Sequence, residues 1–352
     1  MAMQHFMSGK SHTFDHDSIP ARRWASNLFV SRTVEHSLLT VDDKAMDDVA
    51  DIYNDAGDAY AAYADGDPSQ LFAFDGMHGY ADRCVWAALE KKLIDLRASG
   101  ASSVRLLDAG CGPGTWLRRL VIRARSLGFS SITARGFDIA QAQIQRAQSA
   151  SRNLSSLPGV NLTFEVADLA GRLPEPDASV DLTLCLYSAL SHLPVARLPD
   201  ISKEIARVTS GHFIATVRPI GSMPTAFVDS IEKVCRLKQD HARDRCEIDL
   251  SDGRQIAFSF HQFTAAELRN HFSSCFDIED VRGLDLFHSR FMPDSRWNPV
   301  SPSDDSQLAD ELERLEKVYA TRAEFMDRAT HLLLVASGLR TAAPAADVVA
   351  ST

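Results

Sequence analysis

The sequence lacks the features that would direct the chain to a membrane or to nucleic acid. Its 352 residues hold no run of about 18 consecutive apolar residues, which a membrane-spanning helix requires. Residues 1–20 are polar and have no apolar centre like that of a signal peptide. The net charge is −10, whereas a nucleic-acid groove requires clustered Lys and Arg. We therefore expect no membrane and no nucleic-acid partner.

Basic clusters and metal-ligand clusters are also scarce. Four arginines form the densest basic run: Arg118, Arg119, Arg123 and Arg125. They fall opposite apolar residues at helical spacing, which indicates a solvated helix face. The histidines within residues 1–20 have no Cys or carboxylate cluster at ligand spacing, so we predict no metal site.

Cysteine pairs are missing as well. None of the six cysteines lies in a Cys-x-x-Cys pair, and two fall within elements expected in the core. Isolated cysteines of this kind are typical of reduced proteins, and we expect a cytoplasmic location.

The chain does have a regular alternation of strands and helices from residue 103 to residue 217. A long helix over 78–98 precedes it. Strands are expected at 104–108, 132–137, 161–166, 180–186 and 212–217, with helices at 115–127, 140–154 and 198–208. This spacing predicts right-handed crossovers and a parallel sheet with helices on both faces.

The remaining sequence departs from that alternation. Strands at 247–250 and 255–261 flank Ser251-Asp252-Gly253, which indicates a hairpin within an inserted cap. Thr264 is expected to cap a helix, and the last strand is expected at 331–336. We divide the chain into an N-terminal arm and helical lid (1–100), a ligand-binding core (101–218), a cap insertion (219–262), the C-terminal part of the core with an aromatic-rich excursion (263–340) and a disordered tail (341–352).

The stretch 104–115 carries the most specific signal. An apolar strand runs into Asp108 and then into a turn with three glycines: Gly110, Gly112 and Gly114. Glycine at such a turn lets the backbone approach a ligand closely. The dinucleotide fingerprint requires glycine three positions after the second one, where this chain has Thr115. The spacing therefore argues against a nicotinamide site.

Two further strands end on a carboxylate. Asp138 follows the strand at 132–137, where it can accept hydrogen bonds from both hydroxyls of a ribose or can cap the next helix. Asp168 follows the strand at 161–166, where it can bind an adenine amino group or can be a plain loop residue.

The strand at 180–186 delivers its end to the same cleft, because ligands of open α/β sheets bind beyond the carboxyl ends of the strands. Polar side chains that follow it are candidates for contact with the reacting groups: Tyr187, Ser188, Ser191 and His192. An imidazole titrates near neutrality, so His192 is either a general base or a packing residue.

Four segments together resemble the core of the class I S-adenosylmethionine (SAM)-dependent methyltransferases: LLDAGCGPGT, GFDIA, VADL and VDLTLCLYSALSHL. The resemblance covers 103–217 and makes 101–218 the SAM-binding core. It implies an α/β fold with a Rossmann-like, doubly wound sheet of seven mostly parallel strands, in which the strand at 331–336 is antiparallel. An N-terminal helical lid and the inserted cap complete the expected architecture.

The resemblance also implies roles for single residues. The cofactor SAM is expected to contact Asp108, Gly110, Cys111, Gly112, Gly114, Asp138, Ile139, Asp168, Leu169 and Leu186. Tyr187 is expected near the transferring methyl group, and Tyr187 and His192 are the candidate catalytic residues. The candidate substrate-binding residues are Tyr60 and Tyr63, from the N-terminal lid, with Ser188, Ser191 and Arg218.

We therefore expect a SAM-dependent methyltransferase acting on an oxygen or nitrogen atom of a small molecule. The strand at 180–186 runs into Cys-Leu-Tyr-Ser, not Asn/Asp-Pro-Pro-Tyr, which disfavours methylation of nucleic-acid amino groups. Two alternatives stay open: a SAM-consuming lyase or cyclase of the same fold, and a non-catalytic SAM-binding protein. Arg218 either binds an acceptor carboxylate or pairs with the acidic cap. The aromatic cluster at 287–297 either lines the acceptor pocket or anchors the excursion.

Overall fold

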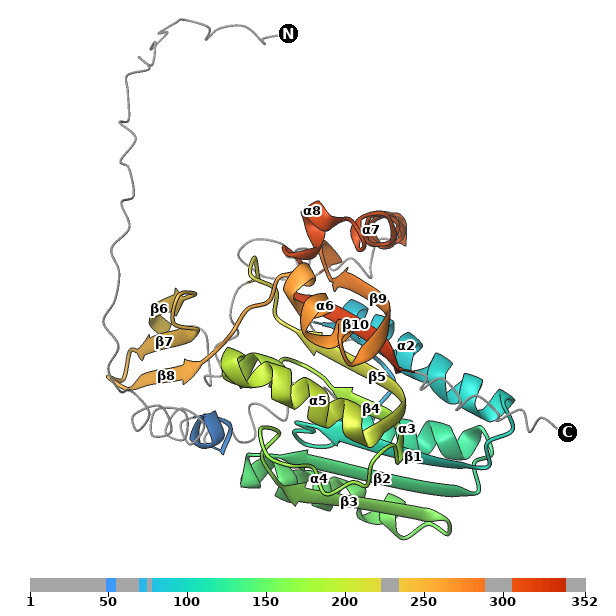
Figure 1. The fold of residues 1–352 in the computed structure, drawn as a ribbon. Helices are drawn as coiled ribbons and strands as arrows, with labels where there is room; N and C mark the ends of the chain where they lie inside the picture. Colours follow the sequence, from blue (N-terminus) through green and yellow to red (C-terminus); the bar gives the residue numbers. More distant parts are fainter. Residues whose placement is uncertain (1–48, 55–69, 75–77, 223–233, 289–305, 340–352) are drawn as a thin grey trace, which may run out of the picture. The chain divides into compact units, whose positions relative to one another are not determined.

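The computed structural model describes residues 49–54, 70–74, 78–222, 234–288 and 306–339, and the statements below concern these residues (Figure 1). Seven strands form the main sheet: β1 (Ser103–Ala109), β2 (Ser131–Asp138), β3 (Val160–Val166), β4 (Val180–Cys185), β5 (Thr209–Val217), β9 (Phe276–Leu284) and β10 (His331–Gly338). Their order across the sheet is β3-β2-β1-β4-β5-β10-β9.

The first five strands are parallel, and β10 is antiparallel to both of its neighbours. From β1 the chain adds β2 and β3 on one side, then returns to place β4 and β5 on the other. The strand order thus reverses between β1 and β4, which is the place where open α/β sheets bind ligands. The predicted doubly wound, seven-stranded sheet with an antiparallel last strand is confirmed.

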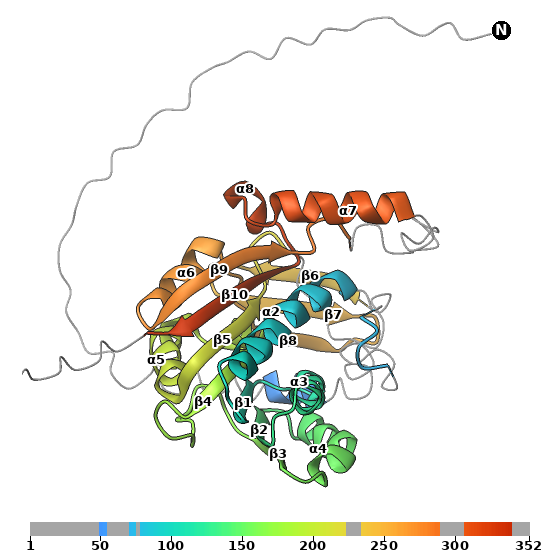
Figure 2. The same cartoon turned by 90° about the vertical axis from the view of Figure 1, so that its right-hand side faces the viewer.

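Helices cover both faces of the sheet (Figure 2). One face carries α2 (Gly79–Ala98), α3 (Thr115–Ser126) and α4 (Gln141–Ser155), and the other carries α5 (Leu198–Val208) and α6 (Ala265–Ser273). Alternate strand residues supply the two cores, so Leu106 faces the first helix layer and Leu107 the second. Helix α2 packs Val85, Leu89 and Leu93 into the first core, so its packing makes it part of that core although it lies within the 1–100 lid segment.

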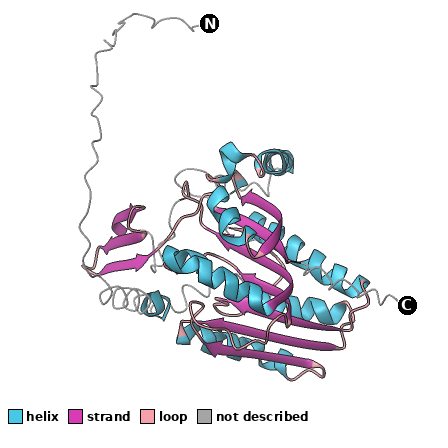
Figure 3. Cartoon of the chain, in the orientation of Figure 1, coloured by secondary structure: helices cyan, strands magenta, loops and turns pink. Residues whose placement is uncertain are grey.

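A second, three-stranded antiparallel sheet consists of β6 (Val234–Asp240), β7 (Arg245–Leu250) and β8 (Gln255–Ser259) (Figure 3). The predicted hairpin is β7–β8. Thr264 caps α6 as predicted, and it does so in a capping box whose second member is Glu267. β6 was not expected from the sequence, because four of its seven residues are polar and it has no alternating apolar pattern.

The segment that follows β9 is anchored by α7 (Ser306–Tyr319), which precedes the short α8 (Ala323–Met326). Glu316 of α7 is fully buried and accepts hydrogen bonds from the backbone N–H groups of Phe287 (2.7 Å) and His288 (3.3 Å). The His288 ring stacks on Tyr80, with 4.4 Å between ring centroids. Of the two predicted roles for the 287–297 cluster, these contacts support anchoring of the excursion for the residues that the structure describes.

The expectation of a solvated arginine face on α3 is wrong for two of its four arginines. Arg118 and Arg119 are 5% and 3% exposed. The Arg119 guanidinium lies 4.7 Å from the ring centroid of Phe74 and 4.5 Å from that of Trp116, while its Nε donates to the Leu71 carbonyl. The segment that covers this face precedes α2, too far away in sequence for helical periodicity to reveal it.

The helices within the described ranges include none that is long and apolar enough to span a bilayer. The same ranges contain no group of three or more His, Cys, Asp or Glu side chains placed to hold a metal ion.

Candidate active site

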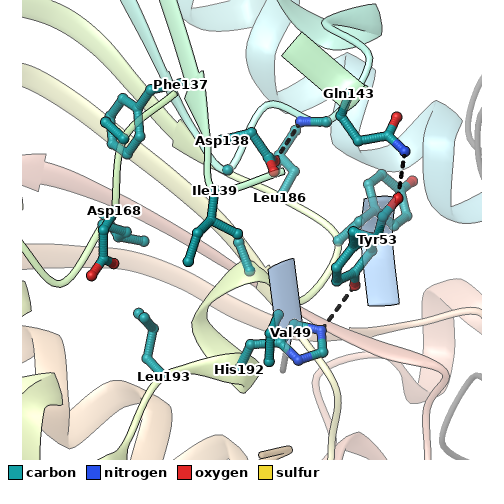
Figure 4. A pocket seen from close by; sticks show the side chains of 16 residues that line it. Val49, Tyr53, Phe137, Asp138, Ile139, Gln143, Asp168, Leu186, His192 and Leu193 are labelled. Atoms are coloured by element: carbon teal, nitrogen blue, oxygen red, sulfur yellow. Dashed lines mark hydrogen bonds between the residues drawn. The ribbon is translucent and has the colours of Figure 1, made fainter. Parts of the chain in front are cut away.

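The carboxyl ends of β1, β2, β3 and β4 meet at one edge of the sheet, around the point where the strand order reverses. A pocket with an empty volume of about 700 Å³, including solvent at its mouth, opens there (Figure 4). Nine residues predicted for cofactor binding or catalysis line it: Gly110, Gly112, Asp138, Ile139, Asp168, Leu169, Leu186, Tyr187 and His192. Their roles stay predictions.

The loop after β1 needs its glycines for both conformation and space. All three have positive φ values, from 51° to 80°. A Cβ atom at Gly110 would lie 2.5 Å from the Cβ of Ala189, and one at Gly114 would lie 2.7 Å from the Phe164 ring. Two backbone N–H groups of the loop donate to the Phe137 carbonyl, at 2.8 and 2.9 Å. The loop is thus fixed against β2 and lines the pocket with its backbone.

Asp138 holds the same loop from the end of β2. Its carboxylate accepts hydrogen bonds from the N–H groups of Gly112 (2.8 Å) and Ala140 (2.9 Å). A carboxylate has about four acceptor positions, so the backbone donors of this loop do not use all of them. Supporting the backbone that leads into α4 and binding hydroxyl groups in the pocket are therefore compatible roles.

Asp108 lies behind the loop and does not line the pocket. It is 2% exposed, and burial, followed by the charge of Asp138, raises its pKa to about 7. Two carboxylates held this close together in a buried place favour a cationic partner. Cys111 and Gly114 also lie off the pocket wall, and burial raises the pKa of the Cys111 thiol well above its usual value.

His192, at the end of the 3₁₀ helix η1 (Ala189–His192), is enclosed by hydrogen bonds and rings. Its Nε2 lies 2.9 Å from the Tyr53 hydroxyl, and its Nδ1 lies 3.2 Å from the Ser259 carbonyl. A carbonyl only accepts, so Nδ1 carries the proton and Nε2 accepts from the phenol. Burial lowers the pKa of His192 to about 4. His192 was predicted to be either a general base or a packing residue, and this geometry supports the packing role.

Residues 49–54 are helical and contribute a pocket wall that sequence reasoning missed. Val49 and Tyr53 line the pocket and pack with the core of the small sheet. The Gln143 amide donates to the Tyr53 carbonyl (3.2 Å), and the Ala142 N–H donates to Asn54 Oδ1 (3.0 Å). This short helix therefore connects the first turn of α4 to β8. Tyr60 and Tyr63, the predicted lid residues, lie outside the described residues.

Tyr187, the residue predicted near the methyl group, is held on several sides. Its φ is 50°, and its N–H donates to Thr216 Oγ1 (2.6 Å). The ring stacks on Trp116, with 5.8 Å between centroids, and the hydroxyl donates to Asp82 of α2. Asp82 was not among the predicted residues, because nothing in the sequence of α2 indicates that its first turns face the end of β4.

Three predicted substrate-binding residues do not line the pocket. Ser188 and Ser191 are buried, and Ser191 Oγ accepts from the Arg218 N–H (3.5 Å). The Arg218 guanidinium donates to the Thr330 carbonyl (3.1 Å) and is 7% exposed. These contacts tie the ends of β4, β5 and β10 together. The structure thus places these side chains within the fold beside the pocket.

Residues 106–212 match the family model of a methyltransferase domain. Over these residues the chain is similar to methyltransferase domains. The matched segment contains the glycine loop, both carboxylates that end β1 and β2, Tyr187 and His192. Such a domain takes SAM as its methyl donor.

No curated protein matches the chain. Among solved structures, magnesium protoporphyrin IX methyltransferase from Synechocystis PCC 6803 is 16% identical, with a TM-score of 0.42, over 83% of this chain and 98% of that one. The CcbJ methyltransferase from Streptomyces caelestis is 12% identical, with a TM-score of 0.43, over 71% and 89%. Geranyl diphosphate C-methyltransferase from Streptomyces coelicolor A3(2) is 14% identical, with a TM-score of 0.39, over 68% and 75%.

The residues of the pocket fit SAM as the ligand of this methyltransferase domain. Gly110 and Gly112 of the loop line the pocket with backbone and present no side chain to it. The buried carboxylates of Asp108 and Asp138 suit a ligand with an ammonium group and a ribose. Apolar side chains, among them Ile139, Leu169 and Leu186, complete the walls.

Proposed function

We propose that the protein transfers the methyl group of SAM to an oxygen or nitrogen atom of a small-molecule acceptor. The observation that carries the proposal is the pocket in which the glycine loop, Asp138 and Tyr187 meet at the carboxyl edge of the sheet. SAM supplies a methyl group already bonded to a good leaving group. The protein therefore has chiefly to hold and align the two reactants.

The binding roles follow from the chemistry of each wall. Asp108, which lies behind the loop, favours the ammonium group of the methionine part through its charge rather than by direct contact, and the loop backbone binds the carboxylate of that part. Asp138 accepts hydrogen bonds from the ribose hydroxyls, and Asp168 binds the adenine amino group. The apolar side chains of Ile139 and Leu169 cover the rings and exclude water from them.

A small acceptor suits this pocket better than a polymer. Val49 and Tyr53 form part of its wall, so a helix of the chain itself occupies space that a large acceptor would need. The acidic net charge of −10 also disfavours nucleic acid. Because all six cysteines are free, we place the reaction in the cytoplasm.

Two measurements test the proposal. Calorimetry should detect binding of S-adenosylhomocysteine, and Gly112→Val should abolish it, whereas Gly253→Ala in a remote turn should not. Mass spectrometry should then detect S-adenosylhomocysteine formed from SAM with a panel of small hydroxyl and amine compounds. Release of methylthioadenosine from SAM alone would indicate a lyase instead. Tight binding with no product from any acceptor would indicate a non-catalytic protein.

A further inference from the structure

We propose that Tyr187 and Asp82 form the proton-accepting pair for the methyl acceptor, and that the acceptor atom is the oxygen of a hydroxyl group. This inference rests on the proposed function and deepens it. Tyr187 is the member that meets the acceptor, and Asp82 is a positioning residue that acts through it. His192 was the candidate base predicted from the sequence, and Asp82 was not among the predicted residues.

Tyr187 is fixed where the pocket wall meets α2. Its main chain is held by Thr216, and its ring packs between Trp116 on one side and His331 on another, with centroid distances of 5.8 and 5.3 Å. Its hydroxyl donates to Asp82 Oδ1. The phenol therefore has one defined orientation, with its proton already directed at a carboxylate.

Asp82 is partly buried and is surrounded by several charges. Arg119 from α3, Arg83 from its own helix and His78, just before that helix, each favour the ionised carboxylate. Burial opposes them and prevails, so the pKa of Asp82 rises to about 6. Near neutral pH this group is an anion that takes up a proton readily, as a proton acceptor in catalysis must.

The neighbours of Tyr187 on the far side remain neutral or paired. His331, from β10, is buried, and burial and then the charges of Arg218 and His78 lower its pKa well below the usual value. His78 Nδ1 lies 3.8 Å from Asp285 Oδ2. The His331 imidazole is therefore neutral. It packs against the ring of Tyr187 and does not compete for the proton of the Tyr187 hydroxyl.

His192 is a poorer proton acceptor than this pair. Burial lowers its pKa to about 4, and its Nε2 lies 2.9 Å from the Tyr53 hydroxyl. A proton arriving from an acceptor would have to displace the Tyr53 hydrogen bond to reach that nitrogen. The hydroxyl of Tyr187 already has a carboxylate to receive its proton.

The chemistry selects a hydroxyl acceptor. A carboxylate acceptor has no proton to lose and would be repelled by Asp82, whereas a neutral amine attacks without prior loss of a proton. With a hydroxyl, the O–H bond breaks as the oxygen bonds to the methyl carbon, and the methyl–sulfur bond breaks with its electron pair left on sulfur. The acceptor proton passes to the Tyr187 oxygen, while the Tyr187 proton passes to Asp82, which later returns it to water.

The titration of the pair can be tested in the full chain without any acceptor. We expect a protein labelled with ¹³Cζ-tyrosine to show one resonance that is lost in Tyr187→Phe. This resonance should move between pH 5 and pH 7 with a midpoint near 6. The movement should vanish in Asp82→Asn and persist in Asp95→Asn, a control at the exposed end of the same helix. Addition of S-adenosylhomocysteine should shift the resonance, because Tyr187 lines the pocket.

Kinetics with hydroxyl acceptors tests the role itself. Asp82→Asn should lower kcat by about 10²-fold or more and remove the acidic limb of its pH profile, while the Kd for S-adenosylhomocysteine stays within about twofold. Three outcomes would overturn the inference and leave the proposed function standing: a Tyr187 resonance that does not change with pH, a wild-type kcat in Asp82→Asn, or methylation of amines only. Absence of S-adenosylhomocysteine binding would overturn the proposed function, and the inference with it.

Discussion

Asp108 occupies a position where folding and ligand binding favour different charge states. Its carboxyl has a pKa of about 7 because of burial and, second, the nearby Asp138. The folded protein therefore holds this proton more tightly than the unfolded chain, in which the pKa is near 3.8. The stability contributed by the proton is fully present below about pH 4 and is lost as the pH rises through about 7.

Replacing that buried charge should stabilise the ligand-free protein at alkaline pH. We expect Asp108→Asn to raise the free energy of unfolding at pH 8 by about 1 to 3 kcal/mol, with no gain at pH 4, in urea titrations. Asp200→Asn, at an exposed position of α5, is the control and should change neither value. Equal stability of Asp108→Asn and wild type at pH 8 would contradict a buried charge at this position.

The same carboxyl makes ligand affinity depend on pH. An ammonium group in the pocket is attracted by the ionised form of Asp108, so protonation of this carboxylate below about pH 7 should weaken binding by up to tenfold for each pH unit. We expect the Kd for S-adenosylhomocysteine at pH 6 to be about tenfold higher than at pH 8, and binding at pH 6.5 to release protons. Calorimetry in two buffers of different ionisation enthalpy measures both quantities, and a Kd independent of pH would exclude Asp108 from the site.

At the scale of elements, the helix at 49–54 joins the pocket to the small sheet through the Tyr53–His192 hydrogen bond. Tyr53→Phe keeps the ring and removes only this bond, leaving a buried nitrogen without its donor. We expect about 1 kcal/mol weaker binding of S-adenosylhomocysteine, or about fivefold, mainly through faster dissociation in stopped-flow measurements. Tyr319→Phe, remote from the pocket, should not change the dissociation rate. An unchanged dissociation rate in Tyr53→Phe would show that the Tyr53–His192 hydrogen bond does not contribute to ligand binding.

The alternating elements of the core could be predicted because each has a strong local signal. The apolar runs predicted β1 to β4 within one or two residues of their observed ends. The strand β5 begins at Thr209, earlier than predicted, because Gly211 packs against β4, where a Cβ would lie 2.1 Å from the Asp181 carbonyl. A helix was expected at 42–63, and its described part, 49–54, is helical. The strand β6 and the place of Val49 and Tyr53 in the pocket wall escaped prediction, because their pairing and packing partners are distant in sequence.

At the scale of the whole molecule, the fold explains why cofactor residues were easier to predict than acceptor residues. Parallel strands bring their carboxyl ends to one edge, so Asp108, Asp138 and Asp168 each follow directly from a strand end. Two partners of Tyr187, Asp82 and His331, come from α2 and β10. Tertiary packing, not local sequence, places these elements at that edge. Sequence spacing therefore predicts where the pocket lies, whereas Asp82 and Tyr53 can be identified as its neighbours only from the folded structure.

Ligand binding should therefore stabilise segments that are far apart in the sequence. At a concentration about 1,000 times its Kd, S-adenosylhomocysteine should add about 4 kcal/mol to the free energy of unfolding. We expect hydrogen exchange at short times to slow in 49–54, in the glycine loop and in β8, because all three meet at the pocket or at His192. Helix α7 is the internal control and should be unchanged. Protection confined to the glycine loop would show that residues 49–54 and the small sheet do not close on the ligand.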